Sequence, residues 1–181
     1  MGKDIFKKSI YENLFSFSER SNLHIPEEII SYISSVLALY YKGFPLYLID
    51  VQETNVYRKN KIRGDLSLLL VGFFREWVNR KNRPLTENDY INTGKISYMN
   101  AYLYLEATYG DIFNREIEKE YIKYISENLN TYLDILKSMS ENFEFYTQFL
   151  NSYREEAKKV DSFLSNFPDL RVIEIKKIFE D

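Results

Sequence analysis

The stretch LNTYLDILKSMSENFEFYTQFLNSYREEAKKVDSFL, residues 129–164, decides the fold class. Its apolar residues recur at alternating spacings of three and four, a heptad pattern that holds for about five heptads. Neither glycine nor proline occurs between positions 111 and 167, so this part of the chain has no strong helix breaker. The pattern predicts a long helix with an apolar seam at Leu129, Tyr132, Leu136, Met139, Phe143, Tyr146, Leu150, Tyr153, Ala157, Val160 and Leu164.

Two arrangements of this helical third are open. We favour a single long or gently bent helix, because a hairpin has no reason to preserve the heptad phase across its turn. However, Ser138 and Glu141 match a capping box, which could begin a second helix after a tight hairpin. The bulky Tyr and Phe residues of the seam shift some weight towards packing against the rest of the chain. The seam predicts self-association only if its apolar face is not covered within the monomer.

The first half of the chain predicts two helices and one strand. Residues 3–20 have apolar residues at helical spacing, and a second helix should run from Pro26, at a first-turn position, to about Tyr41. Residues 45–52, PLYLIDVQ, are the best strand candidate. The only plausible partner for that strand is RVIEIKK, residues 171–177.

A third helix is expected to begin at Asp65 as its N-cap. The helical spacing that follows predicts an apolar stripe of Leu66, Leu69, Leu70, Phe73, Phe74 and Trp77. We expect this helix to be the centre of the fold, and a further helical region to begin at Thr86 and continue towards Gly110.

Residues 85–110 are also similar to helix-turn-helix segments, with Gly94 in mid-segment and Ile96 and Ser97 opening a second helix. The spacing departs by one residue at the turn and again near the end. The would-be recognition helix has only Lys95 as a cation, where several would normally contact phosphates. We therefore favour a helical domain in which the apolar residues of this stretch pack inside, namely Met99, Leu103 and Leu105.

Together these segments predict an all-α or nearly all-α protein. Residues 1–110 should form a multi-helix bundle, and residues 111–181 a long coiled-coil-like helix or helical hairpin with a short terminal element. One minor two-stranded β element, formed by the two strand candidates, is the exception to this fold class.

The sequence gives little support for enzymatic chemistry. Cysteine is absent, and the one histidine, His24, lies in a predicted turn, which excludes thiolate and multi-histidine metal sites. Pro168, Asp169, Glu174 and Lys176 resemble the PD-(D/E)xK nuclease signature. In that family the two acidic elements lie on adjacent strands, and the four residues between Asp169 and Glu174 cannot form the required turn. We therefore expect no enzyme activity, no cofactor and no metal.

Membrane association is not expected either. No apolar run approaches the roughly 20 residues that span a bilayer. Charged residues also interrupt the apolar residues of the N-terminus, unlike a signal peptide. We expect a soluble, cytoplasmic protein.

Positive charge is concentrated between positions 58 and 83. Eight basic residues and two carboxylates give this segment a net charge of +6, whereas the whole chain carries −3, so the remainder carries −9. Basic residues interleaved with Tyr57, Trp77 and Tyr90 could follow a phosphate backbone while the rings stack on bases. The candidate nucleic-acid-binding residues are Arg58, Lys59, Lys61, Arg63, Arg75, Arg80, Lys81 and Arg83.

Two functions from different classes follow. In the first, a non-enzymatic protein binds DNA or RNA through residues 58–83, within a dimer or larger complex that forms through the 129–164 seam. In the second, a protein-binding adaptor, inhibitor or immunity-type module engages a basic partner through its acidic surface. The two hypotheses differ in which charged surface matters.

Overall fold

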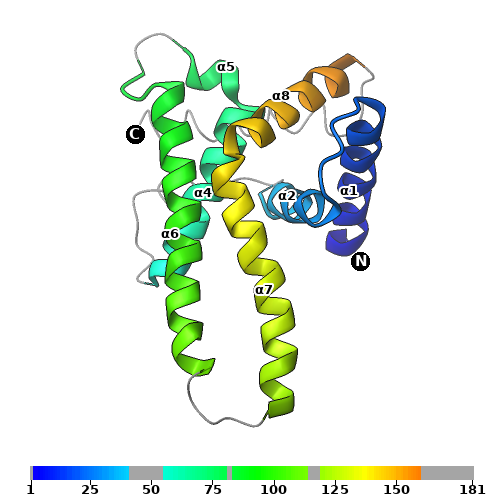
Figure 1. The fold of residues 1–181 in the computed structure, drawn as a ribbon. Coiled ribbons are helices and arrows are strands. Elements are labelled where there is room, and N and C mark those ends of the chain that lie inside the picture. The colour runs from blue at the N-terminus through cyan, green and yellow to red at the C-terminus, as the bar shows by residue number, and fades with distance from the viewer. Residues whose placement is uncertain (1, 41–54, 81–82, 114–118, 160–181) are drawn as a thin grey trace.

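A computed structural model describes residues 2–40, 55–80, 83–113 and 119–159, and within these ranges it contains helices and no strand (Figure 1). The fold is therefore all-α, as predicted. Both strand candidates, 45–52 and 171–177, lie outside the described residues, so the β element stays a prediction. The helices are α1 (Gly2–Arg20), α2 (Glu27–Leu39), α4 (Val56–Phe73), α5 (Arg75–Val78), α6 (Glu87–Phe113), α7 (Lys119–Glu141) and α8 (Phe143–Lys159).

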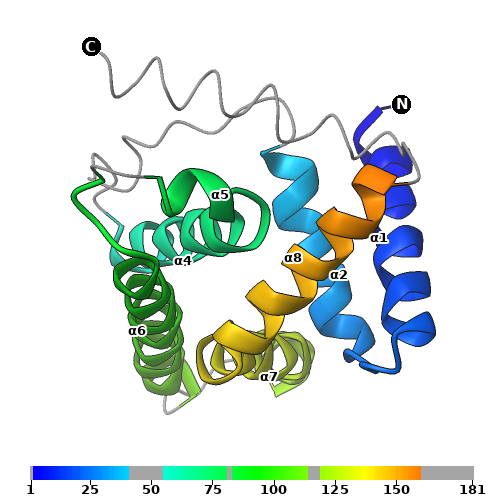
Figure 2. The ribbon, with the colours of Figure 1, turned by 90° about the horizontal axis from the view of Figure 1, so that it is seen from above.

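Helices α1 and α2 pack against each other at one side of the bundle (Figures 1 and 2). Ile10 and Leu14 of α1 are fully buried. The loop that joins the two helices is fixed by the buried Ser18 hydroxyl, which accepts a hydrogen bond of 2.8 Å from the Ile25 amide. Pro26 then stands at the N-cap of α2. Both helices predicted for this region are confirmed.

Helix α4 lies at the centre, in contact with both α6 and α8. Asn55 caps its N-terminus, since the Asn55 side chain accepts a hydrogen bond of 3.0 Å from the Arg58 amide. The prediction that this helix begins at Asp65 was therefore wrong, because Asp65 lies in mid-helix. Every residue from Gly64 to Phe73 is buried, as expected of a helix with neighbours on all sides. The predicted apolar stripe is confirmed as core.

Helix α6 begins with a capping box, in which Thr86 and Asp89 each accept a hydrogen bond from the other's amide. The helix then runs without a break through Gly94, so the helix-turn-helix resemblance was wrong. Gly94 serves packing instead of a turn, because a Cβ at this position would overlap the ring of Phe143. Close approach of another element is the second common reason for glycine in a helix.

The expected packing of the α6 residues is only partly confirmed. Leu105 is buried and Met99 is half-buried, but Leu103 is 50% exposed. Leu103 lies two residues from Leu105, about 200° around a helix, so the two side chains cannot share a face. Leu103, which was predicted to pack inside the domain, thus lies on the outside of the bundle.

The long C-terminal helix is interrupted at one residue, Asn142, between α7 and α8. Backbone hydrogen bonds of 2.9 Å from Asn142 to Ser138 and 3.0 Å from Tyr146 to Asn142 continue the helical pattern on both sides. The direction nevertheless changes strongly: α7 is seen nearly end-on in Figure 2, whereas α8 lies across the view. The chain is therefore neither a gently bent helix nor a hairpin that begins at Ser138.

Contacts with α6 fix this bend. The Ser140 hydroxyl donates a hydrogen bond of 2.7 Å to the Lys95 carbonyl, and the buried Phe143 ring lies with its centroid 6.1 Å from that of Tyr98. These contacts hold the end of α7 and the start of α8 against one helix. The heptad phase survives the bend, but its two halves pack against different neighbours.

The predicted seam is covered within the chain. Its described members from Leu136 to Ala157 are buried in the same hydrophobic core as α1, α2, α4 and α6. The condition for self-association through these residues is therefore not met, and the coiled-coil character is not confirmed. The division into domains at 1–110 and 111–181 stays a prediction, although one core takes residues from both sides of that boundary.

Candidate functional site

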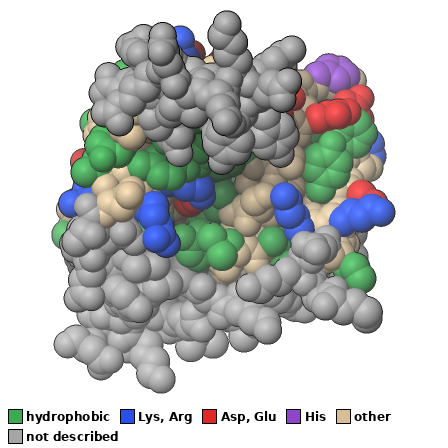
Figure 3. Space-filling model, turned by 90° about the horizontal axis from the view of Figure 1, so that it is seen from below, with side chains coloured by type: hydrophobic (Ala, Val, Ile, Leu, Met, Phe, Trp, Pro, Cys, Tyr) green, Lys and Arg blue, Asp and Glu red, His purple; other side chains and the backbone are tan. Residues whose placement is uncertain are grey.

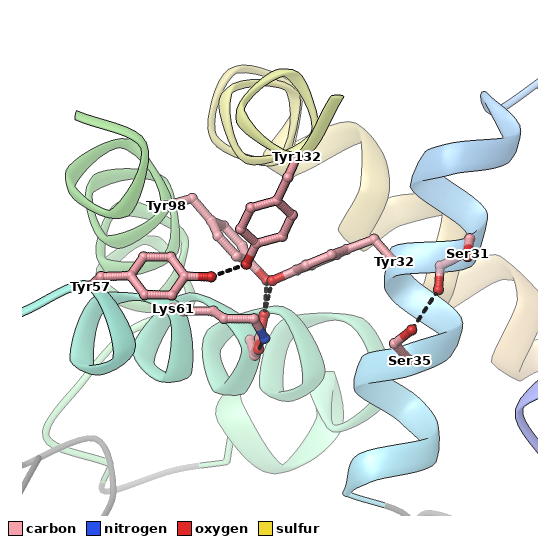
Figure 4. A network of polar contacts seen from close by, with 8 residues as sticks. Ser31, Tyr32, Ser35, Tyr57, Lys61, Tyr98 and Tyr132 are labelled. Carbon is pink, nitrogen blue, oxygen red and sulfur yellow. Dashed lines mark hydrogen bonds and ion pairs between the residues drawn. The ribbon is translucent and has the colours of Figure 1, made fainter. Parts of the chain in front are cut away.

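A buried carboxylate lies beside the predicted basic segment. Asp65 is fully buried on α4, and its Oδ1 accepts hydrogen bonds from the hydroxyls of Tyr32 on α2, at 2.5 Å, and Tyr98 on α6, at 2.6 Å. The Lys61 ammonium lies 2.6 Å from Oδ2 of the same carboxylate, one helical turn away (Figure 4). Three helices thus meet at one anion whose two oxygens are both occupied.

The electrostatics of this cluster favour neutral Tyr32 and Tyr98 around the ion pair of Asp65 and Lys61. Burial raises the pKa of Tyr32 and Tyr98 well above the ordinary value, and the neighbouring Asp65 carboxylate raises it further. Beside them, the hydroxyls of Tyr57 and Tyr132 share a hydrogen bond, which joins α4 to α7 (Figure 4). Because every member has a partner inside the chain, the cluster acts as a structural hub that orients four helices.

Several predicted nucleic-acid-binding residues have other roles. Lys61 neutralises Asp65, as described above. Arg75 pairs with Glu87 across the α5–α6 region at 2.6 Å, and the Arg83 guanidinium lies over the Trp77 ring, 3.8 Å from its centroid. Lys81 lies outside the described residues. The seven described cations therefore do not form one stripe.

The aromatic part of the prediction was wrong for Trp77. Trp77 is only 1% exposed, so its ring cannot stack on a base without unfolding of the core. Tyr57 is half-buried and bonded to Tyr132, and Tyr90 is half-buried against the core. The aromatic residues of this segment pack in or against the core of the bundle. They therefore no longer support a prediction of base stacking.

Three of the predicted cations lie together at the start of α4. Arg58 is exposed, Lys59 and Arg63 are half-exposed, and all three lie within the first eight residues of the helix. The positive end of the helix dipole lies at the same end. We call these three residues the basic start of α4. Arg80, at the far end beyond α5, is exposed and separated from them by the buried half of α4.

On the face drawn in Figure 3, the coloured atoms, which belong to the described residues, form no broad electropositive area. On that face Lys and Arg side chains stand singly between apolar and uncharged ones. The basic start of α4 is the strongest local candidate among the predicted residues.

The described residues also offer little for catalysis. They contain no group of three His, Asp or Glu side chains that could hold a metal ion. His24 lies in the α1–α2 loop with its side chain 64% exposed, as the sequence predicts. A pocket of about 180 Å³ opens between α4, α6 and α8, but the Arg75 and Glu87 side chains that line it already pair with each other. No set of nucleophile, base and orienting group converges there.

Comparisons of the chain with protein-family models, with curated proteins and with solved structures found no match. No function can therefore be transferred from a relative. Among the helices of the described residues, none is long and apolar enough to cross a membrane. Function has to be inferred from the side chains that the fold presents at its surface.

Proposed function

We propose that this protein is a small, non-enzymatic helical protein that binds nucleic acid through the basic start of α4, Arg58, Lys59 and Arg63. One observation carries the proposal. Helix α4 contains four cations and a single carboxylate, Asp65, and that carboxylate is buried and neutralised by Lys61. The other three cations lie together within the first eight residues of the helix.

The proposed contacts are made to phosphates and not to bases. Cations on one short piece of helix can neutralise a few adjacent phosphates, whereas the nearby aromatic rings are engaged in the core. Such binding depends strongly on salt and only weakly on sequence. With three phosphates neutralised on duplex DNA, the log–log slope of affinity against salt should be about −2.7.

Fluorescence anisotropy tests the proposal with labelled duplex DNA, single-stranded DNA and RNA, each titrated at low and moderate salt. The test variant is the triple change Arg58→Gln, Lys59→Gln and Arg63→Gln, which leaves the structural Lys61 intact. A matched control removes the same charge from α1 and α8 through Lys7→Gln, Lys8→Gln and Lys159→Gln. We expect the test variant to lose at least about tenfold in affinity and most of its salt slope, and the control to lose little.

Two results would count against nucleic-acid binding. The first is no binding by the unmodified protein at low salt, where electrostatic attraction is least screened. The second is an equal loss of affinity in both triple variants, which would show that net charge matters and the basic start of α4 does not.

A second candidate function is a protein-interaction module. The observation that favours it lies on another side of the molecule, where the outward side of α6 exposes Ile96 and Leu103. Exposed apolar side chains on one helix face are typical of protein contacts. This function would use α6 and would leave the basic start of α4 unexplained.

A further inference from the structure

Helix α6 exposes apolar side chains on the side that faces away from the bundle. Figure 2 shows α6 at a corner, with α4 on one side of it and α7 on another. The buried residues Tyr98 and Leu105 point inwards, and the opposite side of the helix is exposed by 59% at Ile96, 50% at Leu103 and 42% at Tyr104. We define the outer face of α6 as Ile96, Met99, Leu103 and Tyr104.

Two of these residues, Ile96 and Leu103, define a centre along the helix. Ile96 and Leu103 are separated by two helical turns, about 10 Å, and the point midway between them lies between Met99 and Asn100. When two copies of one helix pair in antiparallel orientation about a twofold axis, residues equally far from the axis face each other. With the axis at this midpoint, Ile96 of one copy would contact Leu103 of the other, twice.

Charged residues beside the outer face have a centre of symmetry only one residue away. Lys95 and Glu106 lie on one edge of α6, since eleven residues are close to three full turns. The point midway between them lies between Asn100 and Ala101. In the same antiparallel pairing, Lys95 of one copy would therefore lie about 3 Å along the axis from Glu106 of the other, on the same edge.

A polar side chain stands at the centre itself. Asn100 is exposed and lies beside the midpoint of both pairs, so its amide would meet the amide of the second Asn100. A carboxamide is both donor and acceptor and can pair with its own copy. Single asparagines at helix interfaces are known to fix register and orientation. Apolar, charged and amide groups thus agree on one arrangement.

We propose that the outer face of α6 is the contact surface of an antiparallel homodimer of this protein. This pairing is independent of nucleic-acid binding and uses a different helix. The Lys95 ammonium now lies 3.4 Å from Glu144 of its own chain, but both side chains are substantially exposed, so this pair competes only weakly with Glu106 of a second copy. One helix face is smaller than the roughly 1,200–2,000 Å² of stable interfaces, so the dimer is weak and depends on concentration.

Sedimentation velocity over a wide range of protein concentration measures the dimer directly. The variant Ile96→Glu with Leu103→Glu places carboxylates on the apolar contact and should raise the dissociation constant at least about tenfold. Both sites are exposed, so the fold should be retained, which circular dichroism and a thermal melt would verify. The control Ile5→Glu with Leu39→Glu makes the same chemical change at positions 61% and 62% exposed on α1 and α2.

Charge reversal tests the antiparallel geometry. Lys95→Glu alone and Glu106→Lys alone each place like charges opposite each other in a homodimer, and both should weaken self-association. A mixture of the two single variants should associate more tightly than either alone, because both 95–106 pairs of the mixed dimer then have opposite charges. Glu144→Gln removes the in-chain pair of Lys95 without a change on α6, and should leave self-association intact.

Three results would overturn the proposal. The protein could remain monomeric at the highest concentration tested. It could self-associate equally well after Ile96→Glu with Leu103→Glu, which would place the contact elsewhere. Finally, it could self-associate through α6 without any gain on mixing the two charge variants, which would exclude the antiparallel register.

Discussion

The two halves of α4 use charge in opposite ways. The first half, Val56–Arg63, has four cations, whereas the second half, Gly64–Phe73, is buried at every position and includes one carboxylate. Lys61 belongs to the first half by sequence and to the second by contact, because its ammonium lies 2.6 Å from Asp65. A run of basic residues in a sequence is therefore not equivalent to a basic surface. Part of the charge serves the interior.

The largest effect on the buried part of the molecule should come from alkaline pH, because it ionises many core tyrosines together and so lowers the stability of the fold. Burial raises the pKa of Tyr40 and of Tyr153 to about 12, and that of Tyr32 and Tyr98 well above the ordinary value of 10.0. The folded protein holds these protons more tightly than the unfolded chain. The resulting stability is complete below about pH 10 and is lost as pH rises through about 12.

Parallel titrations of phenolate absorbance and helical circular dichroism measure this effect. We expect exposed tyrosines to ionise first while the helices persist, and the buried ones to ionise in a later step that coincides with loss of helix. Ionisation of all tyrosines near pH 10 with the helices intact would contradict the burial of the hydroxyl groups around Asp65.

Replacement of Asp65 by alanine should have the next largest effect. The change removes the acceptor of two buried tyrosine hydroxyls and the partner of Lys61, and should lower the free energy of unfolding by about 3–5 kcal/mol. Urea unfolding measures it. The control Glu76→Ala removes a carboxylate that is 74% exposed and lies 3.5 Å from the Lys158 ammonium. This change should lower the free energy of unfolding by less than about 0.5 kcal/mol.

If Asp65→Ala costs as little stability as Glu76→Ala, the contacts between Asp65 and the tyrosine cluster do not stabilise the fold. In that case the hydroxyls of Tyr32 and Tyr98 must find other acceptors, and Asp65 would not be the centre that joins α2 and α6 to α4. Similar costs would also remove the reason to assign Lys61 to the interior.

Much of the fold could be predicted from local patterns. Apolar residues at helical spacing placed α1, α2 and the buried half of α4 correctly, because one buried side is enough to set such a pattern. The bend at Asn142 could not be predicted in this way. The heptad phase continues across it, and the contacts that fix the change of direction, from Ser140 and Phe143 to α6, join residues far apart in the sequence. Periodicity indicates which side is buried but not which neighbour covers it.

The candidate site was less accessible to sequence reasoning. An aspartate before an apolar run has the pattern of an N-cap, so Asp65 was placed at a helix start. Its spacing of four from Lys61 was the available local signal for an intrahelical ion pair. Tyr32 and Tyr98 lie 33 residues away on either side, and no local pattern links positions that distant. Trp77 was misassigned for a related reason, since aromatic spacing alone does not distinguish a stacking surface from core.

The smallest effects compare two lysines on the same half of α4. Lys61→Met removes the cation beside buried Asp65 and should cost about 1–3 kcal/mol, less than Asp65→Ala because Lys61 is 27% exposed. Lys59 is proposed to contact phosphate and not to pair with Asp65. Lys59→Met should therefore change stability by less than about 0.5 kcal/mol, while it lowers nucleic-acid affinity. Urea unfolding and anisotropy, measured on both variants, separate the two roles. If Lys59→Met destabilises the fold as much as Lys61→Met, the start of α4 serves the interior throughout, and its charge is no argument for a nucleic-acid ligand.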